Sequence, residues 1–388
     1  MKIAVYAIAK DEEKFVDRWY ETAKEADYVC VLDTGSADKT VDKLKSYNCI
    51  VKTKIIQPWR FDVARNESLK IIPQGADVLV CLDLDEIIQP GWAEIIRKNF
   101  HGTRGRYLYV WSHESYGRDG VSFNADKIHT KSYYWKNPVH EVLKSYGKES
   151  YCDLPLRVDH WPDQKKSRSN YLPLLELAVK EEPENDRNMH YLGREYMFHR
   201  EYGKAIEALE KHLALRSAVW PPERAASMRF IARCKIMQGK QLEAEAWLQR
   251  AIIEAPEYRE AWFEMMKIMY HAKNWKSCIY YGESCVNIRE RPLSYICEPD
   301  PWGPLPFDML SIAYYNTGRL REALEAANHA LMYGPDDRIM QNVKIMQSYI
   351  GGTVLKSPER PQAGNHISPR RRTLGGRYGR RREPGRGC

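Results

Sequence analysis

The most constraining feature of this sequence is an internal repeat in its second half. Small residues recur at a fixed spacing around a large one, and a proline closes the pattern. One copy consists of Ala244, Leu248, Ala251 and Pro256. Its frame returns 34 residues further on at Cys278, Gly282 and Cys285, and other copies contain Leu192, Gly193, Tyr196, Ala205 and Leu209, or Ala323, Ala327, Ala330 and Pro335. Self-similarity at a fixed period indicates a repeat architecture.

Small residues at these positions allow two antiparallel helices to cross closely, and proline ends each helical unit. The spacing resembles that of the second helix of tetratricopeptide repeats. Four copies are enough to bury a continuous core. We therefore predict an all-α tetratricopeptide solenoid over residues 166–350.

The first half of the chain instead alternates strand and helix signals, which is typical of an α/β sheet. We expect strands at residues 2–9, 27–32, 50–56 and 76–82, and helices at residues 12–24, 38–46 and 62–71. The strand segments are apolar on both faces, as in a parallel sheet covered by helices. From Arg106 to Val142 aromatic, strand-like pieces indicate an antiparallel extension. The α/β domain is predicted to span residues 1–165.

The positive charge of the chain is concentrated at its end. The net charge is +8, and the residues from Ser357 onward contain nine Arg and two Glu. Because residues 351–388 hold almost no large apolar side chains, we predict a disordered Arg-rich tail there. Such a tail can neutralise nucleic-acid phosphates, although a general effect on solubility explains it equally well.

No apolar run approaches the ~20 residues of a membrane-spanning helix. The first apolar run breaks at Lys10 with no cleavage site after it, so a buried strand is favoured over a signal peptide and the protein is expected in the cytoplasm. The nine cysteines are scattered and include no CxxC pair, which predicts reduced, structural thiols.

An acidic motif, Cys81-Leu82-Asp83-Leu84-Asp85-Glu86, follows the last predicted parallel strand. Two carboxylates at such a strand end can share one divalent cation, and their hard oxygen atoms suit Mg²⁺ or Mn²⁺, which also bind phosphate oxygens. Open α/β sheets bind ligands at this edge. A solvated acidic turn is the alternative interpretation.

The acidic motif is the last member of an ordered series. Before it stand AKDEE at residues 9–13, LDTGSADKT at residues 32–40 and ARN at residues 64–66. The series resembles family 2 glycosyltransferases of the GT-A fold, and most of all the bacterial and phage group in which a short GT-A domain runs into tetratricopeptide repeats. The sublancin-type S-glycosyltransferases share that architecture. The resemblance covers residues 2–350 and implies a UDP-sugar donor and a Mn²⁺ or Mg²⁺ ion.

The resemblance also implies roles for residues of the nucleotide pocket. Asp33 would accept hydrogen bonds from the base, while Lys10 and Glu12 would line the base and ribose pocket. Gly35 permits a tight turn beside them, and Asp38 is expected to cap the helix that follows.

For the diphosphate and the metal, the resemblance implies Arg65, Asp83 and Asp85. The planar guanidinium of Arg65 suits a diphosphate, although a surface arginine is the alternative. Asp83 would contact ribose or metal, and Asp85 would be the principal metal ligand. Glu86 is expected to position the loop or the sugar, and Asn66 is as well explained by a structural amide.

Two later motifs contain histidine. Asn137-Pro138-Val139-His140-Glu141 resembles a His-Glu element of the same group, and His140 and Glu141 are the predicted catalytic residues, with Glu141 as general base of an inverting transfer. His160 in Val158-Asp159-His160-Trp161 resembles the closing element and is a predicted third metal ligand; a histidine packed at the domain junction is the alternative. Glu114 and Asp119 are other possible bases. Trp59, Trp111, Trp135 and Trp161 are interpreted mainly as core or junction residues.

The resemblance implies a metal-dependent glycosyltransferase that moves a sugar from a nucleotide-sugar to a macromolecular acceptor, a protein, peptide or nucleic acid, with the helical repeats binding that acceptor. The competing hypothesis is a tetratricopeptide scaffold whose transferase domain is inactive. A third hypothesis is a transferase that acts on modified DNA bases and is steered by the basic tail.

Overall fold

A computed structural model describes residues 1–163 and 171–351 of the chain. It divides into two compact units, Met1–Pro183 with Leu293–Tyr295, and the residues from Glu184 onward without that short segment. Helix α5 (Tyr171–Glu181) therefore belongs to the first unit, although the sequence places residues from 166 onward with the repeats. The predicted tail lies outside the described residues, apart from Gly351 at the end of the last helix. None of the helices in the described ranges is both long enough and apolar enough to cross a membrane.

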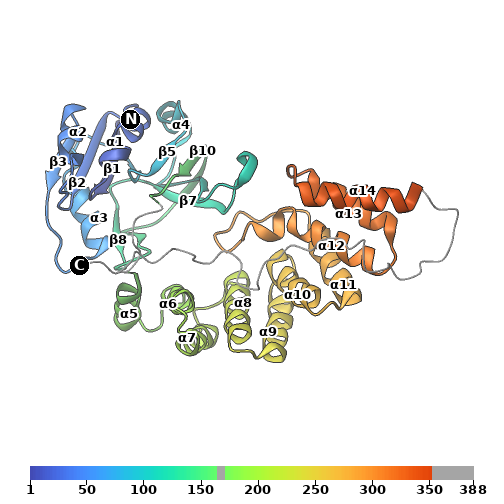
Figure 1. Ribbon diagram of the computed structural model, residues 1–388. Coiled ribbons are helices and arrows are strands. Elements are labelled where there is room, and N and C mark those ends of the chain that lie inside the picture. Colours follow the sequence, from blue (N-terminus) through green and yellow to red (C-terminus); the bar gives the residue numbers. More distant parts are fainter. Residues whose placement is uncertain (164–170, 352–388) are drawn as a thin grey trace, which may run out of the picture. The chain divides into compact units, whose positions relative to one another are not determined.

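The first unit combines helices with a β-sheet (Figure 1). Its main sheet has eight strands in the order β3-β2-β1-β4-β7-β6-β10-β5. Its first four strands in the chain are β1 (Ile3–Ala9), β2 (Tyr28–Asp33), β3 (Ile50–Thr53) and β4 (Val78–Cys81), and they pair in parallel. The others are β5 (Glu86–Ile88), β6 (Arg104–Val110), β7 (Ser122–His129) and β10 (Tyr151–His160). Strand β7 is antiparallel to β4 and β6, and β5 is antiparallel to β10, so the sheet is mixed.

Both faces of the sheet are covered. Helices α1 (Glu13–Ala23), α2 (Thr40–Ser46) and α4 (Trp92–Asn99) pack apolar side chains against those of the strands in one core. The opposite core includes side chains from α3 (Phe61–Leu69) and from a hairpin of β8 (Tyr133–Lys136) and β9 (Val142–Ser145). A short 3-10 helix, η1 (Ser115–Gly117), precedes β7.

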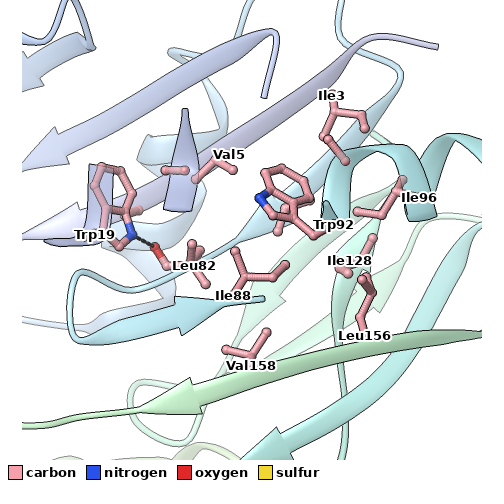
Figure 2. Close-up of a cluster of buried hydrophobic side chains, with 14 of the residues drawn as sticks. Ile3, Val5, Trp19, Leu82, Ile88, Trp92, Ile96, Ile128, Leu156 and Val158 are labelled. Atoms are coloured by element: carbon pink, nitrogen blue, oxygen red, sulfur yellow. Dashed lines mark hydrogen bonds between the residues drawn. The ribbon is translucent and has the colours of Figure 1, made fainter. Parts of the chain in front are cut away.

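The first core also anchors the acidic motif. The fully buried Trp19 of α1 donates a hydrogen bond of 3.1 Å from Nε1 to the carbonyl oxygen of Leu82 (Figure 2). A tryptophan with its N–H satisfied in this way combines a large apolar contact with a directional one. The backbone immediately before Asp83 is thereby fixed against α1.

The second unit consists of helices packed in sequence order, with successive helices side by side (Figure 1). They are α6 (Asp186–Phe198), α7 (Tyr202–Ala214), α8 (Pro221–Met237), α9 (Gln241–Glu254), α10 (Arg259–His271), α11 (Trp275–Asn287), the 3-10 helix η2 (Asp300–Trp302), α12 (Leu305–Asn316), α13 (Leu320–Leu331) and α14 (Asp337–Gly351). The expected all-helical region is confirmed, with α6/α7, α8/α9, α10/α11 and α12/α13 as its hairpins.

The small residues of the repeat pattern lie where these helices meet. Ala205, Ala244, Cys278 and Ala323 are fully buried. A Cβ atom on Gly282 would lie 2.7 Å from Cδ2 of Leu310 on the next helix, so a glycine fits this crossing with the least displacement. The predicted close crossing of helices is confirmed.

The eight cysteines in the described residues are free and buried. Burial raises the pKa of the Cys30 and Cys234 thiols to about 12. A thiol with so high a pKa is a poor nucleophile and acts as a small apolar side chain. The structural role predicted for these thiols is confirmed for these eight, and Cys388 lies outside the described residues.

Candidate functional site

The loops that follow β1 and β2 hold each other at the carboxyl edge of the sheet. The N–H of Asp11 donates to Oγ of Ser36 at 2.9 Å, and the carboxylate of Asp11 accepts the N–H of Ala37 at 2.7 Å. The side chain of Lys10 is exposed beside this contact, and that of Glu12 is half-buried. Lys10 and Glu12, the two residues predicted to line the nucleotide pocket, therefore lie together on the loop after β1.

Asp33, the last residue of β2, holds the turn that contains Ser36. Its carboxylate accepts the N–H groups of Gly35 at 3.2 Å and Ser36 at 3.1 Å, and only 1% of the residue is exposed. Gly35 has a φ of +105°, and a Cβ there would come 2.5 Å from Cδ1 of Ile55, so the turn needs glycine. Asp38 accepts the N–H groups of Glu13 and Thr40, and so serves the first turns of both α1 and α2.

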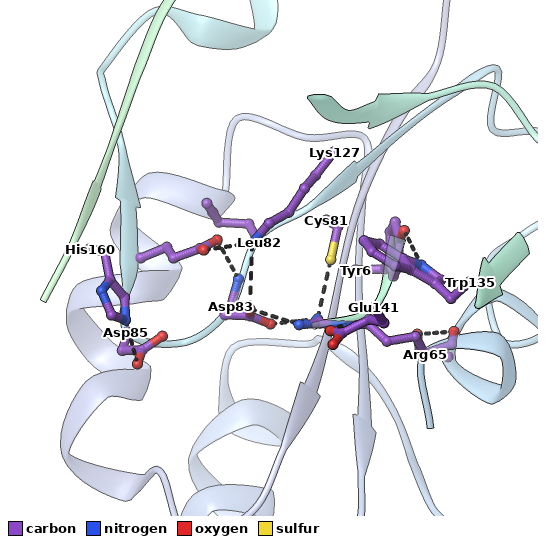
Figure 3. Close-up of polar contacts among 12 residues, drawn as sticks. Tyr6, Arg65, Cys81, Leu82, Asp83, Asp85, Lys127, Trp135, Glu141 and His160 are labelled. Atoms are coloured by element: carbon purple, nitrogen blue, oxygen red, sulfur yellow. Dashed lines mark hydrogen bonds and ion pairs between the residues drawn. The ribbon is translucent and has the colours of Figure 1, made fainter. Parts of the chain in front are cut away.

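A buried arginine connects two of the predicted site carboxylates. Arg65 of α3 donates from both terminal nitrogens to Asp83, at 2.5 and 2.8 Å, and from Nε to Glu141 at 2.9 Å (Figure 3). A bidentate pair of this kind is the strongest geometry for guanidinium and carboxylate. Although burial alone would raise it, the pKa of Asp83 is held well below its ordinary value by Arg65 and, less strongly, by Lys127. Asp83 is therefore an anion with a fixed orientation.

Glu86 positions the acidic loop. Its carboxylate accepts the N–H of Asp83 at 2.9 Å, the hydroxyl of Tyr109 at 2.7 Å and the ammonium group of Lys127 at 2.8 Å. Its side chain is 2% exposed, and both carboxylate oxygens are engaged by these three donors, so Glu86 orients the loop. Asn66 is likewise structural, because its amide exchanges two hydrogen bonds of 2.8 Å with the backbone of Trp135.

On the other side of the acidic loop, Asp85 meets His160. Oδ2 of Asp85 lies 3.2 Å from Nε2 of His160, while Nδ1 of His160 lies 3.1 Å from the carbonyl oxygen of Trp111. Burial would lower the pKa of His160, but the hydrogen bond and charge of Asp85 outweigh burial and raise it. The fold thus joins the predicted principal metal ligand to the predicted closing histidine.

The donor atoms of this pair fit a metal. Neighbouring ligands of an ion with bonds of about 2.0–2.2 Å stand ~3 Å apart, close to the spacing of Asp85 and His160. The Asp83 carboxylate faces Arg65 instead (Figure 3). In the described ranges, ligand atoms of three such side chains gather within 4.8 Å of one another only in the helical unit. The α/β unit therefore offers Asp85 and His160 as a two-residue ligand pair.

Two exposed tryptophans flank the pair. The indole of Trp111 stacks on the His160 ring with centroids 4.3 Å apart, and that of Trp161 stacks on His113 at 3.8 Å. They are 40% and 43% exposed, whereas Trp135 is buried as expected of a core residue. The sequence predicted core or junction positions for most of these tryptophans; the place of Trp161 directly after His160 was the signal available for that residue.

The loop Asn137–Glu141 joins β8 to β9, and positive φ angles at Asn137 and His140 shape it. Glu141 reaches Arg65, whereas the ring of His140 lies 5.7 Å from that of Tyr171 in α5. The two predicted catalytic residues therefore contact different neighbours.

The two alternative bases lie elsewhere in the α/β unit. Asp119 accepts two hydrogen bonds from Arg157, at 2.9 and 2.7 Å. The backbone N–H of Glu114 donates to the carbonyl oxygen of Arg118 at 2.8 Å in the turn before β7. Of the carboxylates proposed as base, Glu141 is the one in contact with Arg65.

The fold is thus an α/β unit followed by a unit of helical hairpins, with a polar cluster at the carboxyl edge of the sheet. No protein-family model matches the sequence, and no curated protein matches it. Solved structures similar to the chain include MamA, at 21% identity and a TM-score of 0.35 over 42% of this chain and 87% of that one. YrrB, a TPR protein with an unusual peptide-binding site, is 17% identical with a TM-score of 0.33, over 46% of this chain and 83% of its own. Pseudomonas aeruginosa PilF is 11% identical with a TM-score of 0.36, over 45% and 72%.

Proposed function

We propose that the chain is a metal-dependent glycosyltransferase of the GT-A type, which transfers a sugar from a UDP-sugar to a macromolecular acceptor. The observation that carries the proposal is the buried Arg65 held against Asp83 and Glu141, beside the Asp85–His160 pair. A cation and a metal-competent pair at the carboxyl edge of an open α/β sheet suit a nucleoside diphosphate.

Asp85 and His160 would hold Mn²⁺ or Mg²⁺, which supplies charge stabilisation for the leaving diphosphate. Arg65 would bind a diphosphate oxygen through guanidinium N–H groups that donate to Asp83 and Glu141 in this structure. The Asp33 turn, Lys10 and Glu12 would receive the base and ribose. Support comes from their common place on the loops after β1 and β2.

Acceptor activation is assigned to Glu141. When Arg65 turns its Nε donor to the diphosphate, Oε1 of Glu141 becomes free to accept a hydrogen bond from the acceptor. A carboxylate in that position can take the acceptor's proton, as an inverting transfer requires. His140 would orient the same loop. The helical unit would present the protein or peptide acceptor.

Turnover of UDP-sugars by the full chain tests this proposal. With Mn²⁺ and a panel of UDP-sugars, the wild-type chain should release UDP, and mass spectrometry should find the mass of the donor's sugar added to an acceptor. Asp85→Ala should abolish release, while Glu94→Gln, at an exposed site on α4, should not. Failure of the wild-type chain to bind any UDP-sugar in Mn²⁺ would overturn the proposal.

A binding scaffold is the second candidate, and a feature of α9 favours it. Leu242 and Ile253 are 82% and 80% exposed, and with the exposed Ala246 they share one face of that helix. Exposed apolar side chains at helical spacing suit a peptide partner. Under this alternative Leu242→Glu abolishes partner binding and no donor is turned over. Under the transferase proposal the same change weakens acceptor transfer but leaves UDP-sugar hydrolysis intact.

A further inference from the structure

Three side chains that can bind a metal converge in the first two hairpins of the helical unit. They are Asp186, the first residue of α6; His212, in the last turn of α7; and Glu223, in the first turn of α8. One ligand atom of each lies within 4.8 Å of the others. The three ends meet because α6, α7 and α8 all pack on one another.

His212 distinguishes this cluster from an ordinary acidic helix start. A carboxylate in the first turn is favourable for the helix dipole alone, which would explain Asp186 and Glu223. His212 is fully buried, however, and its Nε2 has no hydrogen-bond partner in the described chain. A buried polar nitrogen without a hydrogen bond destabilises the fold. The helix dipole explains the two carboxylates but gives no reason for this nitrogen to lie beside them.

The buried nitrogen lies close to a carboxylate, at a distance that suits coordination. Nε2 of His212 lies 3.4 Å from Oε1 of Glu223. Two ligands of a tetrahedral ion with bonds of about 2.0–2.1 Å stand ~3.4 Å apart. A cation between these atoms would give Nε2 of His212 a partner and would also bind Oε1 of Glu223. Asp186 would supply a second negative charge against a divalent ion.

A serine bridge can fix the imidazole in the tautomer that a metal needs. Ser227 Oγ lies 2.9 Å from Nδ1 of His212 and 2.7 Å from Nδ1 of His190. A hydroxyl has one proton, so it donates to one ring at most and can accept from the other. If Nδ1–H of His212 donates to Ser227 and Ser227 donates to His190, Nε2 of His212 presents its lone pair to the cluster. Metal-bound histidines use their second nitrogen in this way.

We propose that Asp186, His212 and Glu223 form a divalent transition-metal site of the Zn²⁺ type, with Ser227 and His190 as positioning residues. Asp186 is half-buried, whereas His212 and Glu223 are buried, so the fourth position of a tetrahedral ion would be taken by water on the Asp186 side. The site would link α6, α7 and α8, and thereby stabilise the first two hairpins of the helical unit.

Metal binding by the full chain tests this inference, with the metal removed beforehand and Asp85→Asn introduced to silence the α/β unit. The chain should then bind one Zn²⁺, measured by competition with a chromophoric chelator, and Co²⁺ should give the intense visible absorption of a tetrahedral site. His212→Gln should abolish both signals. Ser227→Ala should weaken binding by about 10–100-fold, as expected for a residue that orients a ligand.

Asp186→Asn, added to the Asp85→Asn chain, separates loss of the metal from loss of folding. Because Asp186 is a half-buried first residue of α6, this variant should keep the helical circular dichroism while Zn²⁺ binding falls at least tenfold. Zn²⁺ should raise the melting temperature of the Asp85→Asn chain but not of this double variant. Unchanged stoichiometry and affinity in folded His212→Gln or Asp186→Asn would overturn the proposal. Absence of micromolar Zn²⁺ binding in the Asp85→Asn chain would do the same, and either result would leave the transferase proposal untouched.

Discussion

Oδ2 of Asp85 lies 3.2 Å from Nε2 of His160, although 75 residues separate the two in the chain. The antiparallel pairing of β5 with β10 causes this proximity, because it aligns His160 with Glu86, the residue next to Asp85. The backbone reinforces it, since the N–H of Trp161 donates to the carbonyl oxygen of Asp85 at 2.7 Å. Backbone pairing at the edge of the sheet therefore places the two side chains together. Substitutions at Asp85 or His160 should affect the site without unfolding the sheet.

Arg65→Gln should strongly destabilise the α/β unit. The guanidinium is 6% exposed and its removal leaves Asp83 and Glu141 without their shared cation, which costs about 3–5 kcal/mol. Adding Asp83→Asn should recover part of the loss, with a coupling of about 1–3 kcal/mol in urea unfolding. Arg106→Gln is the matched control, because its pair with Asp153 is exposed and should cost under about 1 kcal/mol. Equal losses for Arg65 and Arg106 would contradict this account.

His129 should make stability fall in mild acid. Burial lowers its pKa from 6.5 to about 4, against an opposing hydrogen bond to the Thr130 carbonyl. Between these pH values the unfolded chain binds a proton at His129 and the folded chain does not. The contribution of neutral His129 to the free energy of unfolding is therefore complete above pH 6.5 and is lost as the pH falls toward 4. The loss across this window should be about 3 kcal/mol. His129→Gln should flatten that part of a stability-against-pH curve, whereas His101→Gln, at an exposed residue, should not.

Glycine at the α11–α12 crossing should be required for its size. Gly282→Val places atoms against Leu310 and Met266, so we expect a loss of about 1–3 kcal/mol in thermal or urea unfolding of the helical unit. Gly203→Ala, in α7, is the control: its added Cβ meets nothing within 4 Å, so it should be neutral or stabilise by up to about 1 kcal/mol. A neutral Gly282→Val would show that this crossing is loose.

The indole ring of Trp111 should support activity because it stacks on His160. Trp111→Ala removes the stacking on His160 but keeps the carbonyl oxygen that lies 3.1 Å from Nδ1 of that histidine. A stacking contact of this kind contributes about 0.5–1.5 kcal/mol, so kcat/KM for a UDP-sugar should fall up to about tenfold. Trp111→Phe should retain most of the activity. If both variants match the wild type, the ring has no role at the site.

Much of the fold could be predicted from the sequence, because the first strands and helices carry strong local signals. The expected strand at 2–9 and helix at 12–24 correspond to β1 and α1 within a residue at each end. Strand β10 was missed, although Cys152, Leu154, Leu156 and Val158 alternate with exposed or half-buried residues. Pro155 interrupts that segment and demotes a strand prediction; the structure accommodates it where the register with β6 shifts.

The partners of the site residues could not be predicted. Sequence spacing put Asp83 and Asp85 on one loop, but it did not indicate that Asp83 would be held by Arg65 while Asp85 faces His160. Those contacts depend on how α3 and β10 meet the end of β4. The Asp186–His212–Glu223 cluster has the same origin, since its members come from three helices and form no local motif.

Binding of UDP to the full chain, measured by calorimetry in Mn²⁺ and again in EDTA, tests the central claim most directly. The wild-type chain should bind UDP in Mn²⁺ and lose at least about tenfold in affinity when the ion is removed or when Asp85 is changed to Asn. The exposed variant Glu94→Gln should bind as the wild type does. Absence of UDP binding, or an affinity that is the same in Mn²⁺, in EDTA and in Asp85→Asn, would contradict a metal-dependent donor site at Asp85 and His160.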